Sequence, residues 1–473
     1  MNKIAGIIVF VFSISIYGQA GKNEVLKELE NKKDSYGIVA QKIWNYAEMG
    51  YQEEKSVELL QKSLNDEGFN LTKGVAGMPT AFIAEYGKGE PIIAILGEYD
   101  ALPGLSQQAI PEKKSDNKEA GHACGHHLFG TASTAAAISV KNWLKKNNVK
   151  GTIRFYGCPA EEGGSGKVYL VREGLFNDVD AVLHWHPNSL NDASAGAALA
   201  NKSAKFRFYG TSAHAAISPD KGRSALDAVE AMNMMVNMMR EHIPQEARIH
   251  YVITDGGKAP NVVPDYSEVY YYARHNNRNT VIEIFNRIVK AAEGAALGTE
   301  TKMDYEMIGG THELLPNLTL QKIMYDNLVN IGGITYTNEE KIFADKIAKS
   351  LGLEEVEIEK AKNIQPYKTE AKPFGSTDVG DVSFAVPTAG MSSATWVPGT
   401  PAHSWQAVAA GGTNIGNKGM MVAAKTLALT AIDLFSNTSL LDKAKVELIE
   451  RRGKDFNYVP LLGDRAPALD YRK

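Results

Sequence analysis

The segment GHACGHHLFG, Gly121–Gly130, gathers side chains that bind metals. It holds His122, His126 and His127, three of the chain's 11 histidines, and Cys124, one of its two cysteines. Imidazole and thiolate groups are ligands for zinc, manganese and related ions. The segment therefore predicts one part of a metal site, which other parts of the chain must complete.

The segments around this one predict an alternation of strands and helices. PIIAILGEYDAL, residues 91–102, is a short apolar run that ends in acids, which is typical of a buried strand. LFGTASTAAAISVKNWLKKN, residues 128–147, is typical of a helix rich in small residues. Two further strands are expected, over Thr152–Tyr156 and in VDAVLHWHP, residues 179–187. This order predicts an α/β fold in which helices flank a central mixed sheet, with the chemistry at the strand ends.

The pattern changes near residue 200, which indicates a second domain. NKSAKFRFYGTSAHAAI alternates like an antiparallel strand, and a helix follows over about Ser224–His242. RIHYVITDGG and SEVYYYARHN are strand-like, and a helix over about Thr280–Gly294 precedes the strand-like KMDYEMI. We therefore expect a catalytic domain in two parts, 21–199 and 313–473, with a small α+β domain inserted at 200–312.

The first 20 residues, MNKIAGIIVFVFSISIYGQA, are typical of a secretory signal peptide. Lys3 precedes an apolar run, Ile4–Ile16, and a small-residue cleavage site ends at Ala20. The run is short for a bilayer span, and an uncleaved membrane anchor is the alternative. We expect a secreted protein, exported to a bacterial periplasm.

Composition and charge indicate a globular protein and argue against nucleic-acid binding. The 473 residues include 44% hydrophobic and 22% charged residues, and the net charge is −4, which is ordinary for a globular protein. No concentrated basic run indicates nucleic-acid binding, so a small-molecule substrate is expected. An oxidising compartment favours disulfides, and Cys124 and Cys158 could pair. A metal-bound thiolate at Cys124 would exclude that bridge.

Three other segments carry candidates to complete the site. PAEEGG contains Glu161 and Glu162, LHWHP contains His184 and His186, and GTPAHSW contains His403. One of two adjacent carboxylates can bind a metal while the other accepts a proton from metal-bound water. The pattern predicts a metal-dependent hydrolase. A periplasmic protein that binds a metal or ligand without turnover is the alternative.

Seven motifs occur in an order that resembles a known family. They are GEYDALPG, GHACGHH, PAEEGG, LHWHP, GTSAHAAISPDKGRSALDA, GGKAPNVVPD and GTPAHSW. Together they resemble the co-catalytic metallopeptidase and amidohydrolase family of aminoacylases, glutamate carboxypeptidases and auxin-conjugate hydrolases, nearest to its p-aminobenzoyl-glutamate hydrolase branch. The resemblance covers nearly the whole mature chain. It implies two divalent metal ions, Mn or Zn, and hydrolysis of the amide bond of N-acyl amino acids by metal-activated water.

The resemblance also implies roles for residues of the larger domain. Glu161 would be the general base, and the metal ligands would be Cys124 (bridging), His126, Glu162, His184 and His403. His186 receives no ligand role. Many members of the family have a His-x-Asp ligand motif on the strand before the DALP turn, but here that place reads Leu96-Gly97-Glu98, so the histidine is absent. Glu98 or Asp100 would therefore orient a ligand rather than bind metal. His127 also differs from the aspartate of the auxin-conjugate branch, and Asp378 and Asp381 are expected near the site.

The inserted domain would act as a lid and as a dimerisation domain in this family. The resemblance implies that His214 reaches the active site of a neighbouring subunit and stabilises the oxyanion. Asn261 and Arg274 would hold the substrate carboxylate, for which the planar guanidinium fork is suited. A homodimer, or a heterodimer with a related subunit, is therefore expected.

Overall fold

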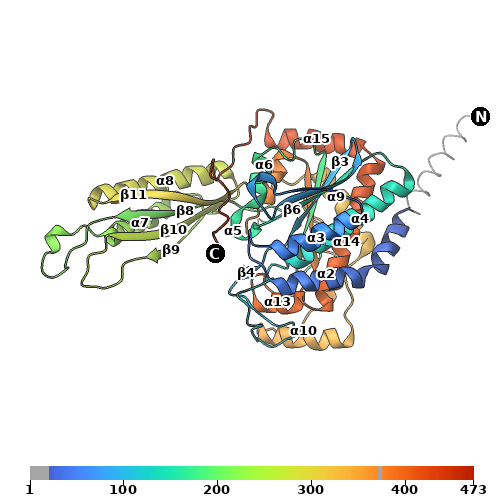
Figure 1. The fold of residues 1–473 in the computed structure, drawn as a ribbon, viewed down its shortest axis with the longest axis horizontal. Helices are drawn as coiled ribbons and strands as arrows, with labels where there is room; N and C mark the ends of the chain where they lie inside the picture. The colour runs from blue at the N-terminus through green and yellow to red at the C-terminus, as the bar shows by residue number, and fades with distance from the viewer. Residues whose placement is uncertain (1–20, 371–374, 473) are drawn as a thin grey trace, which may run out of the picture.

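The computed structural model describes residues 21–370 and 375–472. The predicted signal peptide, residues 1–20, lies outside this part of the chain. The described residues form a broad domain of helices around one sheet, from which a slender second domain projects (Figure 1). The predicted α/β fold with a central mixed sheet is confirmed.

The central sheet is built from six strands: β1 (Asn70–Lys73), β2 (Phe82–Lys88), β3 (Ile92–Glu98), β6 (Gly151–Cys158), β7 (Ala181–Asn188) and β12 (Thr388–Ala394). Their order is β1-β2-β6-β3-β7-β12. β6, β3, β7 and β12 are parallel, and β2 and β1 extend the sheet in antiparallel pairing. The carboxyl ends of the four parallel strands therefore meet at one edge.

The larger core lies on one face of this sheet. Side chains alternate along a strand, so Ile93 and Ile95 of β3 point to the same face as Leu183 and Trp185 of β7. Four helices pack on this face: α3 (Glu54–Asp66), α4 (His126–Asn147), α9 (Leu318–Ile331) and α14 (Asn414–Ser436). A further helix, α2 (Lys33–Tyr46), packs on α3, α4 and α14.

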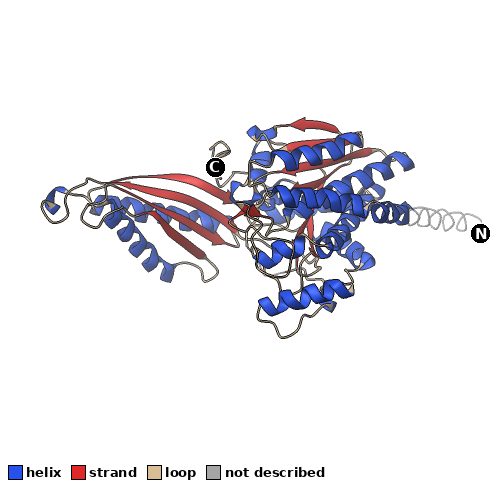
Figure 2. Ribbon diagram, turned by 60° about the horizontal axis from the view of Figure 1, so that its bottom comes forward, coloured by secondary structure: helices blue, strands red, loops and turns tan. Residues whose placement is uncertain are grey.

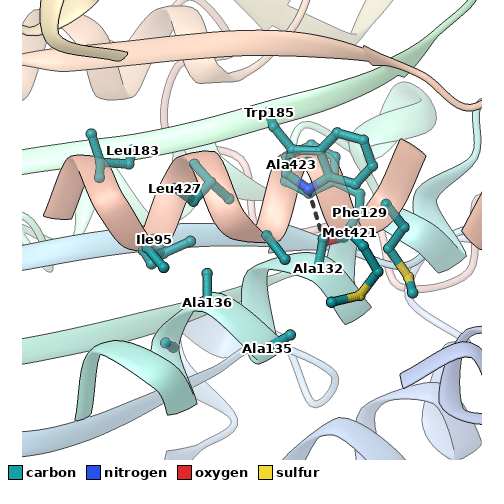
Figure 3. Close-up of a cluster of buried hydrophobic side chains, with 14 of the residues drawn as sticks. Ile95, Phe129, Ala132, Ala135, Ala136, Leu183, Trp185, Met421, Ala423 and Leu427 are labelled. Carbon is teal, nitrogen blue, oxygen red and sulfur yellow. Dashed lines mark hydrogen bonds between the residues drawn. The ribbon is translucent and has the colours of Figure 1, made fainter. Parts of the chain in front are cut away.

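Small residues allow α4 to lie close to the sheet and to α14. Ala132 and Ala136 of α4 point toward Ile95, and the indole Nε1–H of Trp185 donates to the carbonyl of Phe129 at 3.2 Å (Figure 3). The helix begins two residues before the predicted small-residue run. The core packing of α4 therefore also fixes the position of the histidines in its first turn.

The opposite face carries a smaller core. Ala94 and Leu96 of β3 and Val182 of β7 are fully buried there. Two short helices, α6 (Gly166–Arg172) and α12 (Val379–Ala385), cover it together with residues from the C-terminal segment.

Residues 41–69, whose sequence has helical periodicity throughout, contain the end of α2 and the whole of α3, with a break between them. Ala47 and Tyr51 between them have positive φ values of 47° and 63°, which a right-handed helix does not accommodate. The resulting turn directs Tyr51 and Glu53 toward the backbone of residues 160–164 at the strand edge.

The second domain is a four-stranded antiparallel sheet covered by two helices. Its elements are β8 (Ala200–Tyr209), α7 (Ala225–Met239), β9 (Arg248–Asp255), β10 (Tyr266–His275), α8 (Arg278–Gly298) and β11 (Lys302–Thr311). The strand order is β11-β8-β10-β9, and both helices lie on one face (Figure 2). The predicted order of strands and helices is confirmed, and the second helix is longer at both ends than predicted.

The strands of the second domain run outward from the broad domain. β8 begins beside the broad domain at Ala200, and β10 returns to it at His275, the partner of Ala200. Ten residues of strand span about 30 Å. The loops at residues 210–224 and 256–265 therefore lie at the far tip.

The remaining named elements are β4 (Leu102–Pro103), β5 (Ala120–Gly121), α5 (Glu161–Gly164), α10 (Asn338–Ser350), α11 (Glu359–Lys362), α13 (Trp405–Gly411), α15 (Ser439–Arg452) and three short 3-10 turns. Among the described helices, one, α14, is long and apolar enough to cross a membrane. Its most apolar window is 83% buried, as in the core helix of a folded domain.

Candidate active site

Three overlapping groups of metal-binding side chains lie at the carboxyl edge of the central sheet. In each group the ligand atoms are within 4.8 Å of one another. The groups are Cys124 with His126 and His186, Cys124 with Glu162 and His403, and Glu98 with His126 and Glu161. Cys124 is shared by two groups and His126 by two, so the three groups form one continuous site.

The turn before α4 places Cys124 at this edge. Gly125 adopts φ 75°, and a Cβ there would lie 2.6 Å from Pro187, so only glycine fits the turn. The Cys124 Sγ lies 3.4 Å from Nε2 of His186 at the end of β7.

Two carboxylates flank His126, which is fully buried. Its Nδ1 is 2.7 Å from Asp100 Oδ1, and the other oxygen of Asp100 accepts the backbone N–H of Glu162 at 2.9 Å. Its Nε2 is 3.1 Å from Glu98 Oε2. Asp100 therefore orients both His126 and the glutamate loop, which is the role that the sequence left open between Glu98 and Asp100.

His403 reaches the site from a loop before α13. Its backbone N–H donates to the carbonyl of Ala123 at 3.1 Å, and its Nε2 lies 3.1 Å from Glu162 Oε1. Burial opposes ionisation of Glu162, but His403 and His126 outweigh it and lower the pKa of Glu162 to about 2. Glu162 is therefore an anion and a suitable metal ligand.

Glu161 differs electrostatically from its neighbour Glu162. Burial, and then the negative charges of Glu98 and Glu162, raise the pKa of Glu161 well above its ordinary value. Two adjacent carboxyl groups with opposite pKa shifts divide into a proton carrier and a permanent anion. The roles of Glu161 as base and Glu162 as ligand stay predictions, and they require pKa shifts in these two directions.

A buried lysine that the sequence analysis missed supports the site. Lys167 Nζ lies 2.6 Å from Glu98 Oε1 and 2.7 Å from Asp378 Oδ1, and all three side chains are almost fully buried. Burial opposes ionisation of Glu98, but Lys167 and His126 hold its pKa below the ordinary value. In the sequence, the feature that could have indicated this role is the position of Lys167 in the small-residue run GGSGK, directly after the paired glutamates.

The structure does not bring His184 into the metal-binding groups. His184 and His186 point to the same face of β7, but His184 lies one strand repeat, about 7 Å, farther from the edge. The His184 ring lies against Gly390 of β12. A Cβ at residue 390 would lie 2.1 Å from the Nε2 atom of His184. Burial lowers the pKa of His184 to about 4. The structure therefore places His186, and not His184, beside the expected ligands Cys124 and His126, and the ligand role of His184 stays a prediction.

The residues expected to bind the substrate carboxylate are separated within one chain. Asn261 lies at the far tip of the second domain, where its carbonyl accepts the N–H of Ala215 beside His214. Arg274 lies near the broad domain and pairs with Asn201 of β8. The expected pair of Asn261 and Arg274 therefore does not form within one chain, and His214 is likewise remote from Cys124.

The remaining candidates have structural roles. His127 Nε2 lies 3.0 Å from the carbonyl of Gly411, and burial lowers the pKa of His127 to about 3. Asp381 accepts the backbone N–H of His312 at 2.9 Å and the hydroxyl of Tyr458 at 2.8 Å. Asp381 therefore supports the C-terminal segment rather than the metal-binding groups.

Both cysteines are free and buried in the structure. The thiol of Cys158 donates to the carbonyl of Tyr156 at 3.3 Å, whereas Cys124 faces His186. The alternative of a disulfide between them is not realised in this fold.

Metal binding tests which of the two histidines, His184 or His186, is a ligand. His186→Ala is expected to weaken metal affinity more than about 100-fold, beyond the loss typical of residues that only orient ligands. His184→Ala is the matched control and should retain metal. Elemental analysis after dialysis, with calorimetric Mn²⁺ titration, measures both. Loss of metal in His184→Ala alone would identify His184 as the ligand.

The donor atoms themselves fit divalent ions. Glu98 Oε2, His126 Nε2 and Glu162 Oε1 are buried and have no hydrogen-bond partner in the described structure. His126 Nε2 lies 3.1 Å from Glu98 Oε2, and His403 Nε2 lies 3.1 Å from Glu162 Oε1. Neither pair has the geometry of a hydrogen bond, and two ligands of one metal ion lie at similar distances from each other. Unpaired buried polar atoms are costly unless a cation binds them.

The sequence matches one family profile and several known proteins. The profile of Peptidase family M20/M25/M40 matches residues 94–404. The chain is 44% identical to a p-aminobenzoyl-glutamate hydrolase subunit from Escherichia coli (strain K12), over 89% of this chain and 93% of that protein. It is 29% identical to mouse Xaa-Arg dipeptidase, over 90% of this chain and 91% of that protein.

Solved structures show the same fold. An aminobenzoyl-glutamate utilization protein from Klebsiella pneumoniae superposes with a TM-score of 0.59 at 18% identity, over 86% of this chain and 97% of that one. A dinuclear metal-binding M20 peptidase from Bacillus subtilis superposes with a TM-score of 0.56 at 19% identity, over 87% and 99%. The family profile and the relative that is 44% identical show that the chain belongs to Peptidase family M20/M25/M40, and it is a metal-dependent amidohydrolase.

Proposed function

We propose that this enzyme cleaves the amide bond of N-acyl amino acids of the p-aminobenzoyl-glutamate type. The observation that carries the proposal is the meeting of Cys124, His126, His186, Glu162 and His403 around Glu161 at the strand edge. The substrate class rests on the relative that is 44% identical and is named for p-aminobenzoyl-glutamate hydrolysis. The alternative of a binding protein without turnover is disfavoured by membership of a hydrolase family.

We propose two divalent ions, Mn or Zn, with Cys124 between them. Cys124 belongs to both ligand groups, one with His126 and His186 and one with Glu162 and His403, which supports a bridging thiolate. Bound ions of this kind lower the pKa of water and polarise a carbonyl oxygen.

The chain's own carboxyl groups would carry the proton. Glu161 accepts the proton of the attacking water on its carboxylate and donates it to the leaving amine. Its raised pKa favours this exchange, because a base is most effective when its pKa lies near the working pH. The adjacent carboxylate of Glu162 stays ionised during the transfer, because His403 and His126 lower its pKa.

Arg274 is suited to bind the carboxylate of the substrate. Its guanidinium lies 5.3 Å from the ring centre of Tyr272, and its Nε is buried without a hydrogen-bond partner in the described structure. A substrate carboxylate would supply the missing acceptor and match the planar fork of the side chain. Arg274 is therefore placed to bind the free carboxylate of an N-acyl amino acid.

We propose that the second domain pairs with another chain, as a homodimer or as a heterodimer with a related protein. Met234, Met235 and Met238 of α7 are exposed, as are Val252 and Ile253 of the edge strand β9. Exposed apolar side chains on an edge strand and on a helix of the same domain are typical of an association surface. A relative named as one subunit of a hydrolase also supports a partner chain.

Pairing would bring His214 and Asn261 of one subunit to the active site of the other. His214 is exposed, and its Nδ1 accepts the N–H groups of Ala216 and Ile217 at 3.2 Å, so Nε2 carries the proton. Co-expressed Glu161→Ala and His214→Ala chains should recover about a quarter of wild-type activity, because half of the random dimers contain one intact site. If the mixed dimers recover no activity, His214 does not act in the active site of the partner subunit.

The sequence of residues 1–20 supports the proposal that the chain is exported to the periplasm. N-terminal sequencing of the protein recovered from the periplasmic fraction should begin at Gly21. Recovery of uncleaved chain in the membrane fraction would favour the anchor.

Metal content and hydrolysis, measured together, test the proposed reaction. We expect about two ions per chain by elemental analysis and metal-dependent cleavage of p-aminobenzoyl-glutamate, with Glu161→Ala inactive under the same conditions. A panel of N-acyl amino acids and Xaa-Arg dipeptides defines the substrate. Cleavage of dipeptides alone would overturn the proposed substrate class. Metal-loaded protein that cleaves no member of the panel would overturn the proposed reaction.

A further inference from the structure

The C-terminal segment crosses from one domain to the other and ends at the active site. We name residues 456–472, which follow α15, the C-terminal strap. Figure 1 shows the end of the chain at the junction between the second domain and the broad domain, close to α5. The strap therefore contacts both domains before it reaches the paired glutamates.

The middle of the strap binds the last strand of the second domain. Arg465 donates to the carbonyls of Met307 and Ile308 on β11, at 3.1 Å for Ile308. Leu461 packs against Gly310 of the same strand, where a Cβ would lie 2.8 Å from the Leu461 backbone. Because β11 has no side chain at this point, the strap lies directly against the strand.

The strap is also attached to the broad domain. The hydroxyl of Tyr458 donates to Asp381 at 2.8 Å. Arg172 of α6 donates to the carbonyl of Arg465 at 2.7 Å. These contacts hold the path of the strap independently of its last residues.

The last residues of the strap bind the backbone of the catalytic loop. The hydroxyl of Tyr471 and the Nη2 of Arg472 both donate to the carbonyl oxygen of Glu162, at 3.0 and 2.9 Å. The Tyr471 ring meets Tyr51 edge-on, with 5.7 Å between the ring centres. The Glu162 carbonyl thus accepts two hydrogen bonds from outside its own loop.

The loop that carries the paired glutamates needs such support. Ala160 and Ser165 on either side of α5 have positive φ values of 55° and 57°, which side-chain-bearing residues adopt at a cost. Glu162 has ψ 68° and does not follow a helix. Contacts from outside therefore hold the backbone that aims the carboxyl groups of Glu161 and Glu162.

Most of these contacts come from the broad domain. Glu53 accepts the N–H of Ala160 at 2.8 Å, and Asp100 accepts the N–H of Glu162 at 2.9 Å. Tyr51 donates to the carbonyl of Gly164 at 2.8 Å. Within the described structure, the side-chain donors to the Glu162 carbonyl are those of the strap.

We propose that Tyr471 and Arg472 are positioning residues for the hydrolysis, because they fix the Glu161–Glu162 pair and connect it through the strap to β11 of the second domain. The role rests on the proposed function of Glu161 as base and of Glu162 as ligand. Neither strap residue takes part in bond making. Each acts through the orientation of the two carboxyl groups, so its loss should affect turnover and metal affinity more than substrate binding.

Tyr471→Phe, Arg472→Ala and the double variant test the proposal. Partners that orient ligands typically change metal affinity or activity about 10- to 100-fold, so we expect the double variant to lower kcat by this factor with little change in KM. Calorimetric Mn²⁺ titration of metal-free protein should show weaker binding in the same variant. Arg472→Lys, which keeps a cationic donor, should recover part of both.

Tyr458→Phe is the matched control, since it removes another hydroxyl of the same strap, bound to Asp381. It should keep wild-type kcat and metal affinity, whatever its effect on thermal unfolding. Wild-type kcat and metal affinity in the double variant would overturn the proposal. Equal losses in Tyr458→Phe and Tyr471→Phe would show that the strap acts through stability alone. The Mn²⁺ titration tests the role of the strap even if the assayed amides are not substrates. The proposal for the strap and the proposed substrate class can therefore be rejected independently of each other.

Discussion

Replacing Glu161 with glutamine is expected to lower kcat by about 10³-fold while the protein keeps its metal ions. Glutamine has nearly the same shape but accepts no proton, so the water and the leaving amine lose their proton carrier. The neighbouring Glu162 does not substitute, because His403 and His126 hold its pKa at about 2 and its carboxylate faces His403.

Steady-state kinetics on p-aminobenzoyl-glutamate, with metal content measured on the same preparation, checks this result. Glu173→Gln is a matched control, because Glu173 lies in an exposed position at the end of α6 and has a side chain that is 51% exposed. Near-native turnover in Glu161→Gln would remove Glu161 from the role of base. Loss of metal would assign it as a ligand instead.

Replacing Lys167 with methionine is expected to lower the free energy of unfolding by about 3–5 kcal/mol. Methionine fills a similar volume but leaves Glu98 and Asp378 as buried carboxyl groups without their cation. Burial already raises the pKa of Asp378 to about 6 in the presence of Lys167. Removing the ammonium group therefore forces a carboxylate to take up a proton or to remain ionised at high cost.

Denaturant unfolding of metal-free protein, followed by a core tryptophan signal, measures this change. Lys62→Met is the control, since Lys62 pairs with Asp66 on the surface and its side chain is 69% exposed. The double variant Lys167→Met/Asp378→Asn should be more stable than Lys167→Met, because it removes one of the two unpaired charges. A loss in Lys167→Met no larger than in the surface control would contradict the prediction.

The convergence of the site could be predicted because it follows from strand direction. Each candidate segment comes at or beside the end of a strand, and parallel strands bring those ends to one edge. The second domain could be predicted for a similar reason, since its strands alternate and its helices are periodic. Both inferences need only local pattern and the rules of sheet topology.

The choice between His184 and His186 could not be made in the same way. Residues two apart on a strand share a face, so the pattern treats the two histidines as equivalent. Their difference arises from β12, where Gly390 accommodates the ring of His184, and from the turn at Gly125, which brings Cys124 to His186. These contacts join segments that are distant in sequence.

Lys167 and the break between α2 and α3 escaped prediction for related reasons. A lysine is normally exposed, and its burial here depends on Glu98 and Asp378, which lie on two other elements. The break occurs at Ala47 and Tyr51, neither of them a residue that favours positive φ. Tertiary contacts decide both features.

The ligand groups draw on segments at both ends of the chain, from Glu98 to His403. A chain in the course of synthesis therefore holds only part of the donor set until its last quarter has folded against the sheet. Metal acquisition is coupled to completed folding, because an unfolded chain has no preformed site. For a chain that is exported to the periplasm, as we propose, and folds there, the ions come from that compartment. The metal content of the enzyme then reflects the supply in that compartment as well as the chemistry of its ligands.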